Sequence, residues 1–428
     1  MSHFLIKKSI LKGEIIVPPS KSHTLRAILF GTLGNGKSTI HNYLQSTDTA
    51  TMIEACRLLG ATIEVTPTRI EIQGTKGKIN HTEDVINAGN SGIVLRFCSA
   101  IGSLSSNPVV ITGDHSIRHQ RPMKHLLDGL SQLGVSTSSM RGDGFAPIIL
   151  KGPLKSGKAT IFGEDSQPVS ALLIAVAFAE GPVELEVRNA GEKPWVALTL
   201  DWFDRLGILY ENQAFETYRL PGNCRYEGFD YIVPGDFSSA AFPIAAALIT
   251  GSELTIHNID MQDSQGDKEL IPTFQKMGAT FEIDVTDKKL VVKKGKKLSG
   301  ITVDINNFID AITILAVTAC YAEGETWIQN AAVAKQKECN RIQSIATELR
   351  KMGAIITETD SGLRIQGSPL KGASVESYND HRMAMSLSVA GLGAKGETKI
   401  SSVDCVSKTF PTFTQDFNFL GASIRVFP

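Results

Sequence analysis

Six repeats of about 70 residues constrain the fold of this chain more than any other feature. Each repeat holds an amphipathic stretch that ends in Leu-Gly or Met-Gly and leads into an alternating, strand-like run. The apolar spacing of Met52, Cys56 and Leu59 is typical of a helix, and a glycine directly after a helix suits a left-handed C-cap. The six glycines are Gly60, Gly134, Gly207, Gly278, Gly353 and Gly421.

A second series of apolar stretches interleaves with the first. Each stretch opens with residues that cap helices and then turns apolar on nearly all sides, which predicts a buried helix. A glycine turn and another strand follow, as in "AEGPVELEV" and "AKGETKISS". Six such α/β units in 428 residues indicate two lobes of three units each. The buried helices are predicted to begin near Lys21, Asn90, Asp165, Phe237, Phe308 and Asn379.

The composition argues against several classes of protein. The chain carries 43 basic and 44 acidic residues without a polybasic segment, so we expect no nucleic-acid or membrane partner. Its longest uncharged apolar run, residues 311–322, is shorter than the ~20 residues that a spanning helix needs. Lysines interrupt the apolar N-terminal stretch, unlike in a signal peptide. The six cysteines lack CxxC spacing, so we expect a reduced, cytoplasmic protein without a structural metal.

One motif is misleading. Residues 31–38, "GTLGNGKS", match the P-loop pattern for binding nucleotide phosphates. That site requires a strand before the loop and a helix after it, so that helix N–H groups face the phosphate. Here a predicted helix precedes the loop and a strand-like run follows it. We therefore interpret the segment as a turn from a helix to a strand.

Residues that bind anions or move protons stand at the predicted starts of the buried helices. Serine and asparagine at these places are also ordinary helix caps, so each alone is weak support for a site. Bases are different, because a positive charge at a helix start opposes the helix dipole. Lys21 and Arg382 therefore indicate that an anion binds there. The residues at helix starts are Lys21, Ser22, Asn90, Ser91, Ser166, Gln167, Asp310, His381 and Arg382.

Eight segments, in order along nearly the whole chain, resemble the 5-enolpyruvylshikimate-3-phosphate (EPSP) synthase family. They are "PPSKSHTLRA", "GNSGIVLRF", "RHQRPMKHLLDGL", "DSQPVSALL", "GDFSSAAF", "KECNRI", "YNDHRMAM" and "SKTFPTF". The resemblance implies a two-lobed inside-out α/β barrel, with three repeated units per lobe, helices buried and sheets outside. It places residues 21–235 in the first lobe, and residues 1–20 with 236–428 in the second.

The resemblance also implies an activity. The family transfers the enolpyruvyl group of phosphoenolpyruvate to the 5-hydroxyl of shikimate 3-phosphate and releases phosphate, without a metal or another cofactor. Two carboxylates beside a lysine can move the protons that this reaction requires. Asp310 would accept the hydroxyl proton, Glu338 would serve the methylene and methyl carbon, and Lys21 would contact both substrates. We expect a monomer with these small molecules as its partners.

The substrate-binding residues are likewise assigned by resemblance. Guanidinium groups suit the carboxylate and phosphate of phosphoenolpyruvate, and Gly92 leaves room for it against the backbone. The residues for shikimate 3-phosphate are Lys21, Ser22, Arg26, Ser166, Gln167, Asp310 and Lys337. Those for phosphoenolpyruvate are Lys21, Asn90, Gly92, Arg121, Gln167, Arg341, Arg382 and Lys408.

Three positions depart from the family pattern at the acceptor site. Asp165 and Glu192 replace serines, and Val333 replaces an asparagine. We expect the Asp165 carboxylate to cap its own helix, and Glu192 to pair with Lys193 or another base. The competing interpretation is that these acids face the pocket and select a less anionic acceptor.

Two further departures concern glyphosate, which occupies the phosphoenolpyruvate site in this family. Ile93 and Phe97 stand where Thr and Pro are usual, on the helix that follows Gly92. A shift of that helix would crowd the inhibitor, so we expect weaker inhibition than in typical sensitive members.

Rival functions stay open at this point. A related family transfers enolpyruvyl to UDP-N-acetylglucosamine and carries a reactive cysteine in one loop; the corresponding loop here, residues 113–122, has none. A non-phosphorylated cyclitol is another possible acceptor. A non-catalytic anion-binding protein on the same scaffold is the alternative from a different class, and it would have no need of Asp310 and Glu338.

Overall fold

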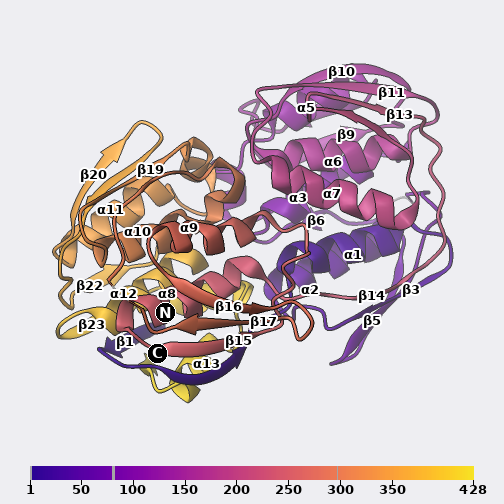
Figure 1. The fold of residues 1–428 in the computed structure, drawn as a ribbon. Coiled ribbons are helices and arrows are strands. Elements are labelled where there is room, and N and C mark those ends of the chain that lie inside the picture. Colours follow the sequence, from indigo (N-terminus) through magenta and orange to yellow (C-terminus); the bar gives the residue numbers. More distant parts are fainter. Residues whose placement is uncertain (1, 80–81, 296) are drawn as a thin grey trace. The chain divides into compact units, whose positions relative to one another are not determined.

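The chain forms two compact units, each with its own apolar core. The structure, a computed structural model, describes residues 2–79, 82–295 and 297–428. The continuous unit comprises Lys21–Val233. The discontinuous unit combines the residues up to Ser20 with Pro234–Pro428. Figure 1 shows the chain coloured along its sequence, with both termini in the discontinuous unit.

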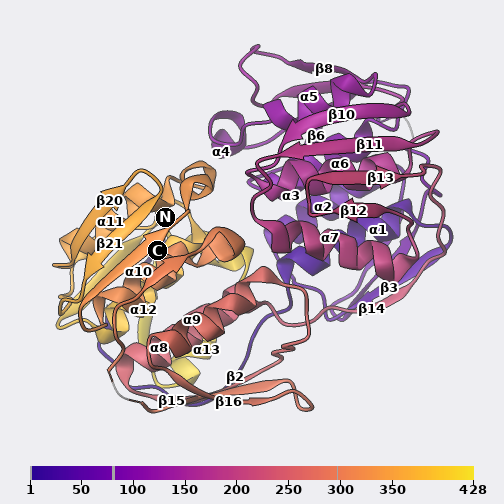
Figure 2. The ribbon, with the colours of Figure 1, turned by 45° about the horizontal axis from the view of Figure 1, so that its top comes forward.

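Among the described residues, each unit contains three four-stranded sheets, and all six sheets have the same pairing. In every sheet one edge strand pairs parallel with its neighbour, and the other two pairs are antiparallel. This shared pairing confirms the predicted repeat of six α/β units. Figure 2 shows β10, β11, β13 and β12 side by side in one of these sheets.

The strands have the following bounds and order. The continuous unit holds β14 (Asp230–Ile232)–β3 (Lys37–His41)–β5 (Arg69–Gln73)–β4 (Thr62–Val65), β6 (Ile86–Asn87)–β7 (Val109–Thr112)–β9 (Ile148–Lys151)–β8 (Ser136–Ser139), and β10 (Gly157–Phe162)–β11 (Val183–Arg188)–β13 (Thr217–Leu220)–β12 (Glu211–Gln213). The discontinuous unit holds β2 (Lys12–Ile16)–β15 (Glu253–His257)–β17 (Lys289–Lys293)–β16 (Thr280–Asp284), β18 (Thr302–Asp304)–β19 (Glu325–Gln329)–β21 (Gly362–Gln366)–β20 (Ile355–Thr359), and β22 (Ser374–Glu376)–β23 (Glu397–Ser401)–β1 (His3–Lys7)–β24 (Ser423–Phe427).

The helices fall into two classes, as the two interleaved series predict. Helices of the first class are buried along almost their whole length, whereas the second class buries one face. The buried helices are α1 (Lys21–Leu33), α3 (Gly92–Gly102), α6 (Ser166–Ala177), α8 (Phe237–Thr250), α10 (Ile312–Cys320) and α12 (His381–Gly393). The amphipathic helices are α2 (Thr47–Leu58), α5 (Lys124–Gln132), α7 (Lys193–Leu206), α9 (Leu270–Lys276), α11 (Arg341–Lys351) and α13 (Phe413–Phe419).

Short helices occupy some of the connections. Within the described parts of the chain, one is the α-helix α4 (His115–His119), and four are 3₁₀ helices. The 3₁₀ helices are η1 (Gly266–Glu269), η2 (Asn306–Ala311), η3 (Ala332–Gln336) and η4 (Val403–Lys408).

Two local predictions are confirmed. All six repeat glycines have a positive φ, between +67° and +112°, as a left-handed end to a helix requires. In the P-loop-like segment, α1 precedes the glycine turn and β3 follows it. The N–H groups of a helix start are therefore not directed at that turn, and the order agrees with a simple connection.

The fifth buried helix corrects one prediction. It begins at Ile312 and not at Phe308, because Phe308 has non-helical φ and ψ values of −142° and 49°. Asp310 therefore lies in η2, two residues before the start of α10, and does not belong to α10 itself.

Candidate active site

Six charged side chains form one ion-pair network in the discontinuous unit. We call it the Arg341 network; its members are Arg341, Arg382, Lys408, Asp310, Glu338 and Asp380. They come from residues at or just before the N-terminal ends of α10, α11 and α12, and from the end of η4. Five of the six were predicted as site residues from the sequence, and the structure brings these five together.

Arg341, the first residue of α11, is the hub of the network. Its guanidinium donates to Asp310 Oδ1 and Glu338 Oε2, each at 2.7 Å. It also contacts both oxygens of Asp380, at 2.7 and 3.3 Å. Burial lowers the pKa of Arg341, but Asp380, Glu338 and Asp310 outweigh that effect and raise it well above its usual value. The guanidinium therefore carries a permanent charge that fixes all three carboxylates.

Each of the two predicted catalytic carboxylates also meets a second base. Asp310 Oδ2 accepts from Arg382 Nη2 at 2.8 Å, and Glu338 Oε1 accepts from Lys408 Nζ at 3.0 Å. Asp310 and Glu338 thus share one guanidinium and have one further base apiece. Such an arrangement positions two proton-transfer groups together with cations that can hold an anionic substrate.

Asp380 is the member of the network that the sequence analysis missed. Its side chain is fully buried, and its Oδ1 accepts from the backbone N–H of Arg382 at 2.8 Å, which makes it the N-cap of α12. The signal was present, since an aspartate directly before an apolar helical run is a typical N-cap. Arg382 also donates to Ser238 Oγ at 3.0 Å, which ties α12 to α8.

Two further residues of the discontinuous unit were singled out from the sequence. Lys337 directly precedes Glu338 in the sequence, and its side chain is buried. Val333 lies in η3 and is partly buried against the apolar core, so its side chain replaces an amide with a packing contact.

In the continuous unit, Lys21 stands at the start of α1, where it was predicted. Its Nζ lies 3.9 Å from Asp48 Oδ2, which also accepts from Ser91 Oγ at 3.0 Å. Asn90 donates to Asp114 Oδ2 at 2.7 Å and therefore stays close to α4. A carboxylate of the chain itself therefore lies beside Lys21. The dipole of α1 predicted an anion at this place but did not identify Asp48.

Gly92 lies among three polar side chains of the same unit. A Cβ placed on Gly92 would be 3.2 Å from Arg96 Nη1, 3.3 Å from Gln167 Oε1 and 3.9 Å from Arg121 Nη1. The structure thereby brings together three residues predicted for phosphoenolpyruvate: Gly92, Arg121 and Gln167. Arg96, which donates to Gln167 Oε1 at 2.7 Å, was missed, although it is the one charge in the apolar sequence of α3.

The start of α6 carries the acceptor-site departures. Asp165 Oδ1 accepts from the backbone N–H of Gln167 at 3.0 Å, which confirms the predicted cap. Its other oxygen pairs with Arg96 Nη2 at 3.1 Å. Glu192 Oε2 accepts from both the backbone N–H and the hydroxyl of Ser166, each at 2.9 Å. Glu192 therefore contacts the residue that was predicted to bind the acceptor's phosphate.

The Arg26 side chain ties α1 to α7. Its guanidinium donates to Thr199 Oγ1 at 3.0 Å and to the carbonyl oxygens of Ser22 and Trp195, each at 3.3 Å. Burial lowers the pKa of Arg26. Ser22 is partly exposed beside it, at the second position of α1.

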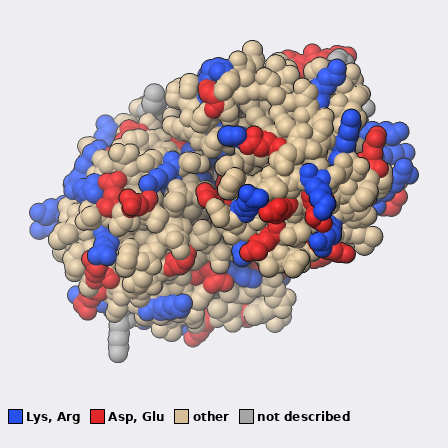
Figure 3. Space-filling view, turned by 90° about the horizontal axis from the view of Figure 1, so that it is seen from above, with Lys and Arg blue, Asp and Glu red and all other residues tan. Residues whose placement is uncertain are grey.

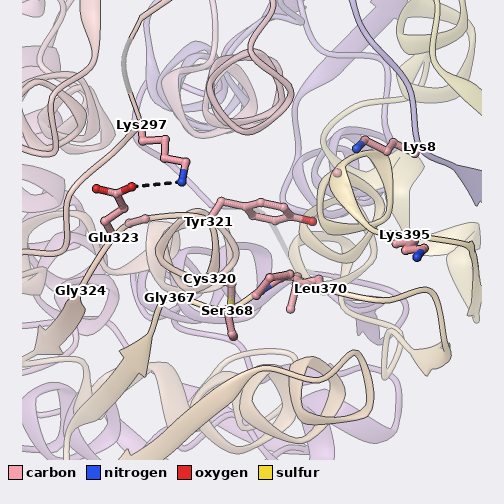
Figure 4. A pocket seen from close by; sticks show the side chains of 13 residues that line it. Lys8, Lys297, Cys320, Tyr321, Glu323, Gly324, Gly367, Ser368, Leu370 and Lys395 are labelled. Carbon is pink, nitrogen blue, oxygen red and sulfur yellow. Dashed lines mark ion pairs between the residues drawn. The ribbon is translucent and has the colours of Figure 1, made fainter.

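The discontinuous unit also contains a pocket of about 490 Å³ that is remote from the Arg341 network. It is lined by residues at the C-terminal ends of α10 and α12, such as Tyr321 and Lys395, and by residues of other connections, among them Lys297 between β17 and β18 (Figure 4). Lys297 pairs with Glu323 at 3.1 Å. The network lies at the opposite ends of these helices. Lys395 follows the C-terminal end of α12 and complements the dipole of that helix.

Other features concern metal ligands, cysteines and membrane-spanning helices among the described residues. They include no group of three or more His, Cys, Asp or Glu side chains arranged to hold a metal ion. All six cysteines are described, and all are free. None of the described helices is both long and apolar enough to span a bilayer. On the face shown in Figure 3, basic and acidic side chains are interspersed.

Comparisons with known proteins point to one family. A family model described as "EPSP synthase (3-phosphoshikimate 1-carboxyvinyltransferase)" matches residues 6–417. A 3-phosphoshikimate 1-carboxyvinyltransferase of Chlamydia caviae is 44% identical over 99% of this chain and 95% of its own length. One from Acetivibrio thermocellus is 42% identical over 98% of each chain. A solved EPSP synthase of Acinetobacter baumannii superposes with a TM-score of 0.82, at 28% identity, and covers 100% of both chains.

Proposed function

Because the chain belongs to the EPSP synthase family, we propose that it transfers the enolpyruvyl group of phosphoenolpyruvate to the 5-hydroxyl of shikimate 3-phosphate. The observation that carries this proposal is the Arg341 network. Asp310 and Glu338 are bonded to one guanidinium and flanked by Arg382 and Lys408. Paired carboxylates among fixed cations suit a reaction that moves protons on an anionic substrate.

The reaction divides the proton transfers between the two carboxylates. Asp310 takes the proton of the acceptor hydroxyl while the oxygen of that hydroxyl bonds to C2 of phosphoenolpyruvate. Glu338 supplies a proton to the methylene carbon. In the second half, Glu338 removes a proton from the new methyl group while the C–O bond to phosphate breaks. One proton enters and one leaves at the same carbon, so Glu338 ends each cycle protonated, as it began. The departing phosphate takes up the proton that Asp310 accepted from the hydroxyl, so Asp310 ends each cycle ionised, as it began.

The bases bind the substrates' anionic groups. In the discontinuous unit, Arg341, Arg382 and Lys408 hold the carboxylate and phosphate of phosphoenolpyruvate, and Lys337 serves shikimate 3-phosphate. In the continuous unit, the residues around Gly92 serve phosphoenolpyruvate. The acceptor residues of that unit are Lys21, Ser22, Arg26, Ser166 and Gln167, and those for phosphoenolpyruvate are Lys21, Asn90, Arg121 and Gln167.

The rival functions have less support. The loop of residues 113–122 lacks the cysteine of the UDP-N-acetylglucosamine enzymes. A non-catalytic anion-binding protein would not need Asp310 and Glu338 on a shared guanidinium. The acids at the start of α6 are the one observation that favours a less anionic acceptor, such as a non-phosphorylated cyclitol.

A phosphate-release assay tests the proposal. The protein is incubated with phosphoenolpyruvate and, in separate reactions, shikimate 3-phosphate, unphosphorylated shikimate, UDP-N-acetylglucosamine or no acceptor. We expect rapid release with shikimate 3-phosphate alone, and a strong loss in Glu338→Gln. If phosphate is released faster with another acceptor, that acceptor replaces the proposed substrate. If the rate of phosphate release is the same with and without an acceptor, the transfer reaction is rejected. A monomer in the cytoplasm stays a prediction; sedimentation velocity would measure the molecular mass.

A further inference from the structure

Glu192 stands at the N-cap position of α7, but its backbone and side-chain conformations are not those of a residue that caps this helix. It precedes α7, yet its side chain makes no capping hydrogen bond to that helix. Its backbone is left-handed, with φ +45° and ψ 37°, which is strained for a residue with a Cβ. The residue is only 1% exposed. A strained, buried carboxylate indicates that its position is held by contacts elsewhere.

Those contacts lie at the start of α6. Glu192 Oε2 is 2.9 Å from both the amide nitrogen and the hydroxyl oxygen of Ser166. The N–H groups of a helix start, together with the helix dipole, favour an anion at this place. Asp165 occupies the next free N–H, that of Gln167. The first turn of α6 is therefore neutralised from within the chain, by two carboxylates.

We propose that Glu192 lowers the protein's preference for a phosphorylated acceptor, because its carboxylate occupies the position that the acceptor's phosphate takes on Ser166. This inference rests on the proposed function, in which Ser166 binds that phosphate. The two donors of Ser166 cannot serve the carboxylate and a phosphate oxygen at the same time, because the two anionic oxygens would then repel each other at close range. The phosphate must displace Glu192, and the displacement weakens acceptor binding.

The test is equilibrium binding of shikimate 3-phosphate and of unphosphorylated shikimate, measured by calorimetry. It compares the wild type with Glu192→Ser and Glu192→Gln. Serine removes both the negative charge and the side chain that reaches Ser166. Glutamine removes the charge but keeps a side-chain oxygen that can accept from Ser166. We expect Glu192→Ser to bind shikimate 3-phosphate about tenfold more tightly or better, with Glu192→Gln between it and the wild type. Affinity for unphosphorylated shikimate should change little.

Asp165→Asn is the matched control, because Asp165 is the other carboxylate at the same helix end and does not contact Ser166 in the hydrogen bonds above. A gain in Asp165→Asn as large as that in Glu192→Ser would mean that nearby charge alone matters, and would overturn the inference. Unchanged or weaker binding of shikimate 3-phosphate by both Glu192 variants would also overturn it.

The proposed function and this inference can fail separately. If the wild type turns over shikimate 3-phosphate and the Glu192 variants show no gain in affinity, only the inference is wrong. If neither the wild type nor the variants bind shikimate 3-phosphate, both are wrong. Tighter binding by Glu192→Ser in a protein that releases no phosphate from phosphoenolpyruvate would support the inference and reject the catalytic proposal.

Discussion

Replacing Arg341 by Met should destabilise the discontinuous unit by about 3–5 kcal/mol, the usual cost of removing one partner from a buried ion pair. Arg341 is 1% exposed, and Asp380 is 0% exposed. Asp310 and Glu338 would keep Arg382 and Lys408. Asp380, by contrast, would lose its contacts of 2.7 and 3.3 Å to the guanidinium. The cost therefore comes mainly from Asp380, whose buried charge would lose its guanidinium partner.

Urea-dependent hydrogen exchange, followed by mass spectrometry of peptides from each unit, measures this loss. With a slope of ~1–3 kcal/mol per molar urea, the unfolding midpoint of the discontinuous unit should fall by roughly 1–5 M. The midpoint of the continuous unit should change far less. The measurement resolves the two units, so it does not assume that the whole chain unfolds in one step.

Arg350→Met is the matched control on the same helix. Arg350 pairs with Glu358 at 2.9 Å, but the two side chains are 43% and 34% exposed. An exposed pair of this kind contributes about 0–1 kcal/mol. The reasoning is refuted if Arg341→Met costs no more than Arg350→Met, because burial of the network would then not determine its contribution.

The remaining predictions concern activity. Glu338→Gln and Asp310→Asn should each lower turnover by about 10²-fold or more and leave substrate binding within about tenfold, since each removes a proton-transfer group but keeps its shape; near-normal turnover in a phosphate-release assay would remove that residue from catalysis. Gly92→Ala should raise the KM for phosphoenolpyruvate, because a Cβ would lie 3.2 Å from Arg96 Nη1 and 3.3 Å from Gln167 Oε1; an unchanged KM would show that these side chains yield. Glyphosate should inhibit less strongly than it inhibits a family member with the usual Thr and Pro, and equal inhibition constants measured side by side would contradict this.

The repeat made most of the fold predictable from the sequence. Its apolar periodicity and its glycines report local structure, which short stretches of chain determine. The pairing of the strands could not be predicted in the same detail. Where the pattern was ambiguous, as at the start of α10, a single residue with non-helical φ and ψ decided the boundary.

The partners of the site residues were harder to predict, because they are far apart in the sequence. Lys21 meets Asp48, and Arg341 meets Asp380, 39 residues away. Sequence patterns identified the bases but not the carboxylates that neutralise them. The contact between Glu192 and Ser166 was missed for a similar reason, since it joins the starts of two helices of one repeat that are 26 residues apart in the sequence.

The strand order of the last sheet has a consequence for the order of folding during synthesis. The first strand, β1, lies between β23 and β24, and His3 is opposite Ser401 on one side and Phe427 on the other. Nearly 400 residues must be translated before the first of these partners exists. At ~5–20 residues per second, this takes about 20–80 s. The strands of the continuous unit all lie between residues 37 and 232. This unit can therefore fold before the partners of β1 have been synthesised. A nascent chain of this protein therefore carries an unpaired hydrophobic strand for most of its synthesis, and chaperones that shield the N-terminus should matter more for its yield than those that act on the finished chain.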